Sequence, residues 1–318
     1  MGLGIKRLDS LKLGIDPVLT NLAQRYENPA FVSNLILPDV MVEKQTGKYP
    51  IFGKESMMVY ETERALKSPV KEMPVEDWTF GSFNLKEQAL ETTIDHLEEE
   101  SARDIIDIET YYAESLMDSL LLGKEYTAVQ MLTNSTSYAA GNVTTLGAGS
   151  EFTVDTVDPI EIIRDSMEVV RSKTNQLPNT IVLGHPTFVA LQSNPKILEK
   201  IKYSQIGVVT EDLISAMLSN QSNKVVVRVG TGMYHDKLTN QFVDLWGDVV
   251  VMAYNKKNGS SVSKYEQSFG KAFVKTGYPV VKRSLDRNEI LKYIASFLMY
   301  GHYITHNEAG YLIKNTVA

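Results

Sequence analysis

The sequence predicts an α+β protein built from two structural units. Residues 98–132 carry apolar side chains every three or four positions without an interrupting proline, which indicates one long helix. Residues 155–255 alternate helical patterns with short apolar runs that are typical of buried strands. Residues 40–96 and 256–318 have the pattern of extended chain, and we expect the long helix to lie on the strands of the latter.

The first forty residues have the composition of an arm rather than of a domain. Turn formers such as Gly14, Pro17 and Pro38 separate short apolar patches, and a short helix is expected over 20–26. Such a segment is too small to bury its own apolar side chains. It therefore has to pack on another part of the protein.

A long polar segment separates two predicted strands, one near 40–52 and one at 83–94. Residues 54–80 hold Pro69 and Pro74, many charged residues and few apolar ones. Loops of this length inside compact domains are uncommon and are usually functional. We therefore predict a two-stranded projection that makes few contacts with the rest of its own chain.

Local signals place the elements of the α/β unit. Asp158, Pro159 and Glu161 form a strong helix start, because aspartate caps free amides and proline fits the first helical turn. Residues 134–150 are rich in Gly, Asn, Ser and Thr, which predicts a flexible connector. Residues 180–185 are expected to form a strand, and the near-continuous apolar runs at 224–229 and 248–254 predict buried strands.

Composition and charge exclude several classes of protein. The chain of 318 residues has no cysteine, which excludes a disulfide scaffold, a thiolate zinc site and a cysteine nucleophile. No run approaches the roughly 18 apolar residues of a membrane span, so no membrane partner is expected. The net charge of −7 argues against a protein whose main task is to bind nucleic acid.

Catalytic and cofactor-binding motifs are missing from the sequence. It has neither phosphate-binding glycine motif and no G-x-S-x-G, so we predict neither an enzyme nor a cofactor. The best metal candidate is His302 and His306 with Glu308. The residues between the histidines favour a strand, which would hold positions i and i+4 about 13 Å apart. Two polar residues on a sheet are therefore favoured over a metal site.

Two segments of opposite charge stand out. Residues 86–114 hold ten carboxylates against two basic residues, a net charge of −8, and residues 256–292 have a net charge of +6. The basic stretch either binds nucleic acid, or faces the acidic run of a neighbouring subunit, or pairs within one chain and faces water. The sequence leaves all three interpretations open.

The order of these parts, together with four stretches of sequence, resembles the major capsid proteins of tailed bacteriophages, whose fold was first seen in a lambdoid phage. The stretches are LPDVMVEKQTGKYPIFGKE (37–55), DIETYYAESLMDSLLLGKEYTAVQML (107–132), IVLGHPTFVALQSNPKILEKIKY (181–203) and GKAFVKTGYPVVKRSLDRN (270–288). None of the four stretches is a catalytic signature. The resemblance extends over nearly the whole chain.

The resemblance implies a tailed-phage major capsid fold divided into five segments. They are an N-terminal arm (1–40), an extended loop with its flanking strand (41–82), a peripheral domain with a spine helix (83–150), an axial domain (151–262) and the return of the peripheral domain (263–318). It implies no enzyme activity and no cofactor.

The same resemblance implies a structural subunit that forms hexamers and pentamers in an icosahedral head around double-stranded DNA, which is held without sequence specificity. The implied location is the virion, after assembly in the host cytoplasm. The implied partners are further copies of the chain and separate scaffolding, portal and decoration proteins. We expect no long scaffolding segment fused to this chain.

Charged residues of the extended loop and of the basic stretch are the expected inter-subunit contacts. They are Lys54, Glu61, Glu63, Arg64, Lys67, Lys71, Lys271, Lys275, Lys282 and Arg283. Some members of the family crosslink a lysine to an asparagine of a neighbour with the help of a glutamate. No motif fixes those positions here, where the residues that come into question are Lys54, Lys67 or Lys71 with Asn315 and Glu308.

Two alternative functions are kept open. An encapsulin-like shell that encloses a cargo enzyme would share the fold and differ in its contents. A hydrolase using carboxylates would need a pocket with clustered titratable groups, and the sequence does not indicate one.

Overall fold

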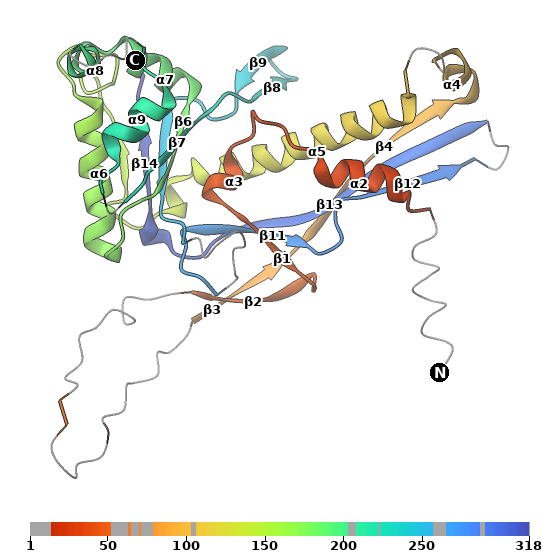
Figure 1. Ribbon diagram of the computed structural model, residues 1–318, viewed down its shortest axis with the longest axis horizontal. Coiled ribbons are helices and arrows are strands. Elements are labelled where there is room, and N and C mark those ends of the chain that lie inside the picture. Colours follow the sequence, from red (N-terminus) through yellow and green to blue (C-terminus); the bar gives the residue numbers. More distant parts are fainter. Residues whose placement is uncertain are drawn as a thin grey trace.

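A long helix connects two five-stranded sheets (Figure 1). The computed structural model describes residues 14–51, 63–64, 70, 79–102, 106–202, 208–221, 223–256, 265–286 and 290–317. We call one sheet the long sheet, because its central strand β13 runs for 14 residues. We call the other the α/β sheet, because helices cover one of its faces (Figure 1).

The long sheet has the order β1-β11-β13-β12, and β4 pairs with the other edge of β13. Its strands are β1 (Asp39–Val42), β4 (Lys86–Asp95), β11 (Gly270–Lys275), β12 (Val280–Leu285) and β13 (Leu291–Ile304). β1 is parallel to β11, and the other pairs are antiparallel. The predicted strand 83–94 is therefore β4 in this sheet, preceded by the end of β3.

Helix α5 (Ile108–Leu132) lies along the long sheet and contacts β13 and β4 (Figure 1). Its buried face includes Ala113, Met117 and Leu120, while Tyr112 and Leu116 are partly buried against the same core. The helix is continuous through Gly123. From Ile108 to Leu132 the predicted helix is continuous and rests on the β structure of the C-terminal segment, as expected.

The predicted start of the long helix is wrong. Residues 96–102 form a separate helix, α4 (His96–Ala102), and α5 begins only at Ile108. Asp107 has extended backbone angles and caps α5, because its carboxylate accepts hydrogen bonds from the Thr110 amide and hydroxyl. In the sequence, apolar residues recur at helical spacing on both sides of Asp107. The pattern therefore does not reveal that α5 begins there.

The α/β sheet has the order β5-β14-β10-β6-β7. Its strands are β5 (Val143–Thr145), β6 (Thr180–Gly184), β7 (Val226–Gly230), β10 (Val249–Ala253) and β14 (Gly310–Lys314). β10 is buried at every residue, which confirms the prediction from its continuous apolar sequence. The same prediction is only partly right for β7, an edge strand in which Val226 is half-buried and Arg228 is exposed. β6 forms the predicted strand and is buried at every residue.

Two cores lie on opposite faces of the α/β sheet. Ile181 and Leu183 of β6 belong to the core formed with the helical layer, whereas Val182 belongs to the core on the other face, with the C-terminal end of α5. The helices of the layer are α6 (Pro159–Thr174), α7 (His185–Ser193), α8 (Pro195–Ile201) and α9 (Glu211–Leu218). α6 is capped by Asp158 and begins with Pro159, as predicted.

Residues 134–150 are not the flexible connector that their composition predicts. They contain the 3-10 turn η2 (Ser135–Ser137) and strand β5, which pairs in parallel with β14. Asn142 is wholly buried and donates hydrogen bonds to the carbonyl oxygens of Glu308 and Gly310. β14, which was expected in the peripheral return, therefore completes the α/β sheet together with β5.

The N-terminal segment packs on the rest of the chain, as an arm of this composition must. Helix α2 (Pro17–Arg25) lies beside β12 and α5, and its Leu19 and Ala23 enter the core of the long sheet. The short helix α3 (Ser33–Ile36) packs against the α/β sheet. The chain then enters β1.

The flanks of the predicted projection form a two-stranded sheet. β2 (Thr46–Ile51) and β3 (Thr79–Asn84) are antiparallel, with Thr46 opposite Asn84 and Ile51 opposite Thr79. This confirms a paired base, although the expected single strand near 40–52 is divided into β1 and β2. Most of 54–80, and with it the prediction of few contacts, lies outside the described residues.

Three small elements complete the fold. β8 (Met233–Asp236) and β9 (Gln241–Asp244) form a hairpin between β7 and β10, and η3 (Asn307–Ala309) precedes β14. In the part of the chain that the structure describes, no helix combines the length and the hydropathy that crossing a bilayer requires.

Candidate assembly interface

Glu125 connects three segments of the molecule that are distant in sequence. It is buried on α5, and its carboxylate accepts hydrogen bonds from the amides of Val32 and Ser33 at 3.1 Å and from the Trp246 indole at 2.9 Å. The amides belong to the start of α3, and Trp246 belongs to the turn before β10. A buried carboxylate with these donors fixes the arm and the α/β sheet relative to α5.

The neighbouring residue Lys124 makes a second link. Its ammonium lies 2.7 and 2.8 Å from the two carboxylate oxygens of Asp39, at the start of β1. Lys124 is 5% exposed. Two adjacent charged residues on one helix are therefore both buried and both paired, one with β1 and one with α3 and Trp246.

Two glycines make room for the Trp246 turn. Gly184 and Gly230 face each other in the parallel register at the ends of β6 and β7. A Cβ atom on Gly184 would lie 1.7 Å from the Gly247 carbonyl oxygen, and one on Gly230 would lie 2.2 Å from the Trp246 ring. Any larger residue at either position would displace the turn that carries Trp246.

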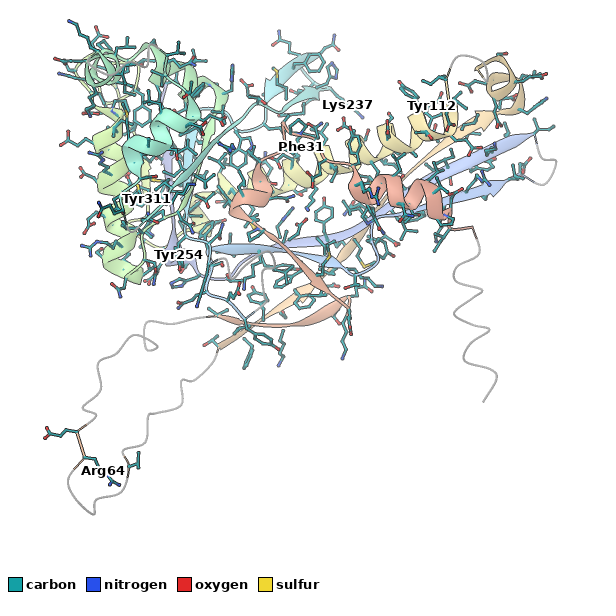
Figure 2. All side chains as sticks on the ribbon, in the orientation of Figure 1. Phe31, Arg64, Tyr112, Lys237, Tyr254 and Tyr311 are labelled. Carbon is teal, nitrogen blue, oxygen red and sulfur yellow. The ribbon has the colours of Figure 1, made fainter. Side chains whose placement is uncertain are left out.

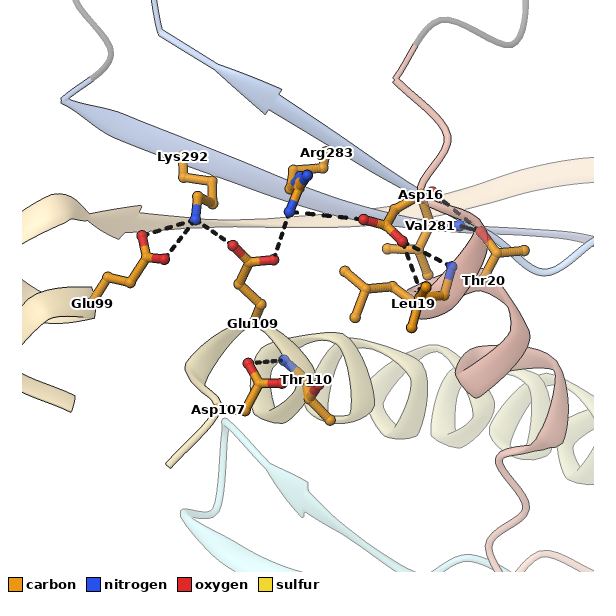
Figure 3. Close-up of polar contacts among 11 residues, drawn as sticks. Asp16, Leu19, Thr20, Glu99, Asp107, Glu109, Thr110, Val281, Arg283 and Lys292 are labelled. Carbon is orange, nitrogen blue, oxygen red and sulfur yellow. Dashed lines mark hydrogen bonds and ion pairs between the residues drawn. The ribbon is translucent and has the colours of Figure 1, made fainter. Parts of the chain in front are cut away.

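A network of charged side chains ties the tip of the long sheet to α5 and to the arm (Figure 3). Arg283 lies 3.0 Å from Glu109 and 3.8 Å from Asp16. Lys292 contacts both Glu99, at 2.8 Å, and Glu109. Partial burial by itself would lower the pKa of Lys292, but its hydrogen bonds to Glu109 and Glu99 and their charges raise it overall.

These contacts are ion pairs between the acidic run and the basic stretch of the same chain. Glu99 and Glu109 belong to the acidic run, and Arg283 and Lys292 belong to the basic stretch. For these residues the pairing occurs within one chain, as the third interpretation of the sequence had it. Arg283 is thus engaged by its own subunit, which the sequence could not distinguish from a contact with a neighbour.

The structure separates the other predicted contact residues by exposure. Glu63 and Arg64 are exposed (Figure 2). Lys282 is exposed, with its ammonium 4.6 Å from the centre of the Phe297 ring, and Lys275 is half-buried, 5.7 Å from the centre of the Tyr278 ring. The remaining loop residues Lys54, Glu61, Lys67 and Lys71 lie outside the described residues.

Lys271 corrects the predicted set. Its side chain is wholly buried, and its ammonium donates a 2.6 Å hydrogen bond to the Glu266 carbonyl oxygen. Burial lowers the pKa of Lys271 to about 8, against the opposing effect of the Glu266 charge. The position lies inside the subunit because β11 is an inner strand between β1 and β13, so Lys271 is not a surface contact.

His302, His306 and Glu308 line one cavity of about 760 Å³, together with Ile51 and Met131. His302 is buried, and its Nε2 lies 3.2 Å from the Lys124 carbonyl oxygen, so Nε2 carries the proton. Burial and the Lys124 charge lower the pKa of His302 to about 4. Among the residues that the structure describes, no three His, Asp or Glu side chains are grouped closely enough to hold a metal ion.

The residues proposed for a crosslink are only partly placed. Asn315 is exposed and has a left-handed backbone with φ of 56°, directly after β14. Glu308 lies in η3 and lines the cavity. The three candidate lysines fall outside the described residues, so the crosslink stays a prediction.

Sequence reasoning did not identify Glu125 and Trp246, or the hairpin β8–β9. A signal exists for Glu125, because it falls on the buried stripe of an otherwise apolar helix face. A signal also exists for the hairpin, where Asp236 and Asn240 flank a turn between two short alternating segments. The partners of Glu125 are distant in sequence and have no local signature.

Comparisons with known proteins identify the family, although no protein-family model matches the chain. The chain is 36% identical to the major capsid protein of Burkholderia phage BcepMu over 310 residues, which cover 97% of this chain and 98% of that protein. This chain belongs to the phage major capsid proteins. It is a structural capsid subunit rather than an enzyme, and its place is the capsid of the virion.

Solved structures agree with the capsid fold. A phage-related protein of Bordetella bronchiseptica superposes with a TM-score of 0.80 at 23% identity, covering 96% of this chain and 98% of that one. The capsid of cyanophage P-SCSP1u gives a TM-score of 0.59 at 8% identity, with coverages of 91% and 89%. The α+β capsid fold predicted from the sequence is therefore confirmed, and the hydrolase alternative is set aside.

Proposed function

We propose that this capsid subunit forms hexamers and pentamers in an icosahedral head that encloses double-stranded DNA. The observation that carries the proposal is its identity to a phage major capsid protein along nearly the whole chain. The exposed strand β4 supports it, because the first six of its ten residues are exposed and a subunit in a closed shell has such surfaces covered by neighbours.

The proposed inter-subunit contacts are the charged residues that the structure leaves at the surface or does not describe. Glu63, Arg64, Lys275 and Lys282 are the described members, and Lys54, Glu61, Lys67 and Lys71 complete the set. Exposed ion pairs contribute about 0–1 kcal/mol each, so several have to act together to orient neighbouring subunits.

The shell we propose holds its DNA without reading its sequence, because a net charge of −7 does not favour a tight grip on phosphates. Separate scaffolding, portal and decoration proteins are its proposed partners, and the host cytoplasm is its proposed site of assembly. An encapsulin-like shell has less support, since the relative that covers the whole chain is a phage capsid protein.

Electron microscopy of the purified full-length chain tests the proposal. Closed particles built from rings of six and five subunits are expected, and particles recovered from infected cells should hold nuclease-protected DNA. Stacked open tubes or a monomer at all concentrations would contradict the proposal, and a protein cargo in place of DNA would support the encapsulin alternative.

A charge-reversal variant tests the proposed contacts. Reversal of Lys275 and Lys282 to Glu should make assembly weaker and change its dependence on salt, because exposed charges are screened over about 8 Å at physiological ionic strength. Light scattering against salt concentration measures assembly, and circular dichroism verifies the fold. Unchanged assembly would show that these two lysines do not orient subunits.

A further inference from the structure

The hairpin β8–β9 presents large apolar side chains to solvent. Leu238 at its turn is 96% exposed, Phe242 is 70% exposed and Met233 is 46% exposed. The hairpin stands away from the α/β layers on the side of α5, with Lys237 in its turn (Figures 1 and 2). Apolar groups gathered on one exposed element of a folded protein mark an interaction surface.

The two faces of the hairpin are used differently. In the antiparallel register Tyr234 is opposite Val243, and His235 is opposite Phe242. Tyr234 packs edge to face on Tyr126 of α5, with ring centres 5.2 Å apart. One face therefore attaches the hairpin to its own subunit, whereas Phe242 and Met233 on the other face remain exposed.

The turn holds Leu238 in a fixed outward position. The Asp236 carboxylate accepts hydrogen bonds of 3.0 Å from the Leu238 amide and from the Thr239 hydroxyl. The Asn240 amide donates to the Asp236 carbonyl oxygen at 2.8 Å, and Asn240 adopts a left-handed backbone. An apolar side chain on an ordered turn loses little conformational entropy on binding.

Charge and family membership identify the occupant. Residues 233–244 carry two aspartates and one lysine, so the hairpin has no basic excess with which to hold DNA. The chain is a capsid subunit, and the surface that a capsid subunit meets most often is that of an identical copy. We propose that the open face of β8–β9, with Leu238 and Phe242 at its centre, docks on a second copy of this chain within the shell.

This inference rests on the proposed shell, and thiol labelling tests it. The chain has no cysteine, so Leu238→Cys introduces a single thiol on a side chain that supports no core. Assembled particles and dissociated subunits are treated with a maleimide. We expect the thiol to react at least about tenfold more slowly in particles, because docking on a copy excludes the reagent. Phe242→Cys gives an independent second position.

The labelling result separates this inference from the proposed function. Equal reactivity of both thiols in particles and in subunits would overturn the hairpin contact and leave the shell intact. Absence of particles from the unaltered chain would overturn the proposed shell and, with it, the hairpin contact.

Matched substitutions provide the functional readout. Leu238→Ser combined with Phe242→Ser should raise the protein concentration needed for assembly by about tenfold or more, because a few central apolar contacts carry most of the binding energy of an interface. Lys237→Ser, in the same turn, should leave that concentration within about twofold. Thermal unfolding of the subunit should be unchanged in both variants. Equal assembly of the two variants would overturn the inference.

Discussion

The two five-stranded sheets differ in how completely they are buried. In the α/β sheet, β6 and β10 are buried at every residue between the helical layer and the end of α5. In the long sheet, the inner strand β11 is also buried at five of its six residues, but the edge strands β4 and β12 are largely exposed and the helices cover one face. The difference indicates that the α/β sheet supplies stability from its own core, whereas the long sheet keeps surface for neighbouring subunits.

Crowding at the end of β6 offers the largest expected effect. Gly184→Ala would place a methyl group within 1.7 Å of the Gly247 carbonyl oxygen. The backbone has to move, so we expect a loss of more than about 4 kcal/mol of stability. Gly123→Ala on α5 is the matched control, because it meets no atom within 4 Å and should stabilise the helix by about 1 kcal/mol. Urea unfolding measures the stability of both variants. Equal changes in the two would contradict the crowding inferred at Gly184.

Two lysines of the long sheet distinguish its interior from its surface. Lys271→Glu places a carboxylate in a wholly buried position and should cost about 3 kcal/mol or more. Lys282→Glu changes an exposed side chain and should alter stability by less than about 1 kcal/mol. Chemical denaturation followed by circular dichroism checks the pair. A Lys271→Glu subunit with unchanged stability would show that the side chain at position 271 is not buried.

The junction between the sheets has an intermediate expected effect. Glu125→Gln keeps an acceptor for one or two of the three donors and removes the charge, so we expect a loss of about 1–3 kcal/mol. Trp246 fluorescence should change in the folded variant, since its indole loses a charged partner. Glu91→Gln, on the exposed part of β4, makes the same change at the surface and is the matched control. An unaltered emission spectrum would contradict the assigned role of Glu125.

At neutral pH the smallest expected effect is that of His302, because its contribution to stability changes only below about pH 6.5. Its pKa is about 4 in the folded chain and 6.5 as the ordinary value, so the unfolded chain binds more protons between these limits. Stability should therefore fall as the pH drops from 6.5 to 4, by at most about 1.4 kcal/mol per pH unit from this group. His302→Gln should flatten this part of the profile. If the stability of both proteins changes with pH in the same way, His302 does not contribute to the pH dependence.

The sequence alone determined the elements that depend on near neighbours. The cap at Asp158, the buried strands β6 and β10 and most of α5 were predictable, because capping and apolar periodicity act over a few residues. The family resemblance supplied the capsid fold and function. The role as a structural capsid subunit is confirmed by a relative that matches 97% of the chain, and the fold is confirmed by a solved structure that covers 96% of it.

Only the tertiary structure decided how distant segments meet. Pairing of β5 and β14 in the α/β sheet, burial of Lys271 and the three donors around Glu125 all join residues far apart in sequence. The partners of Glu125 and the burial of Lys271 have no local signature, and charge counts carry no information about burial. The pairing of strands from distant segments sets these positions, because each depends on which surface the rest of the fold presents to it.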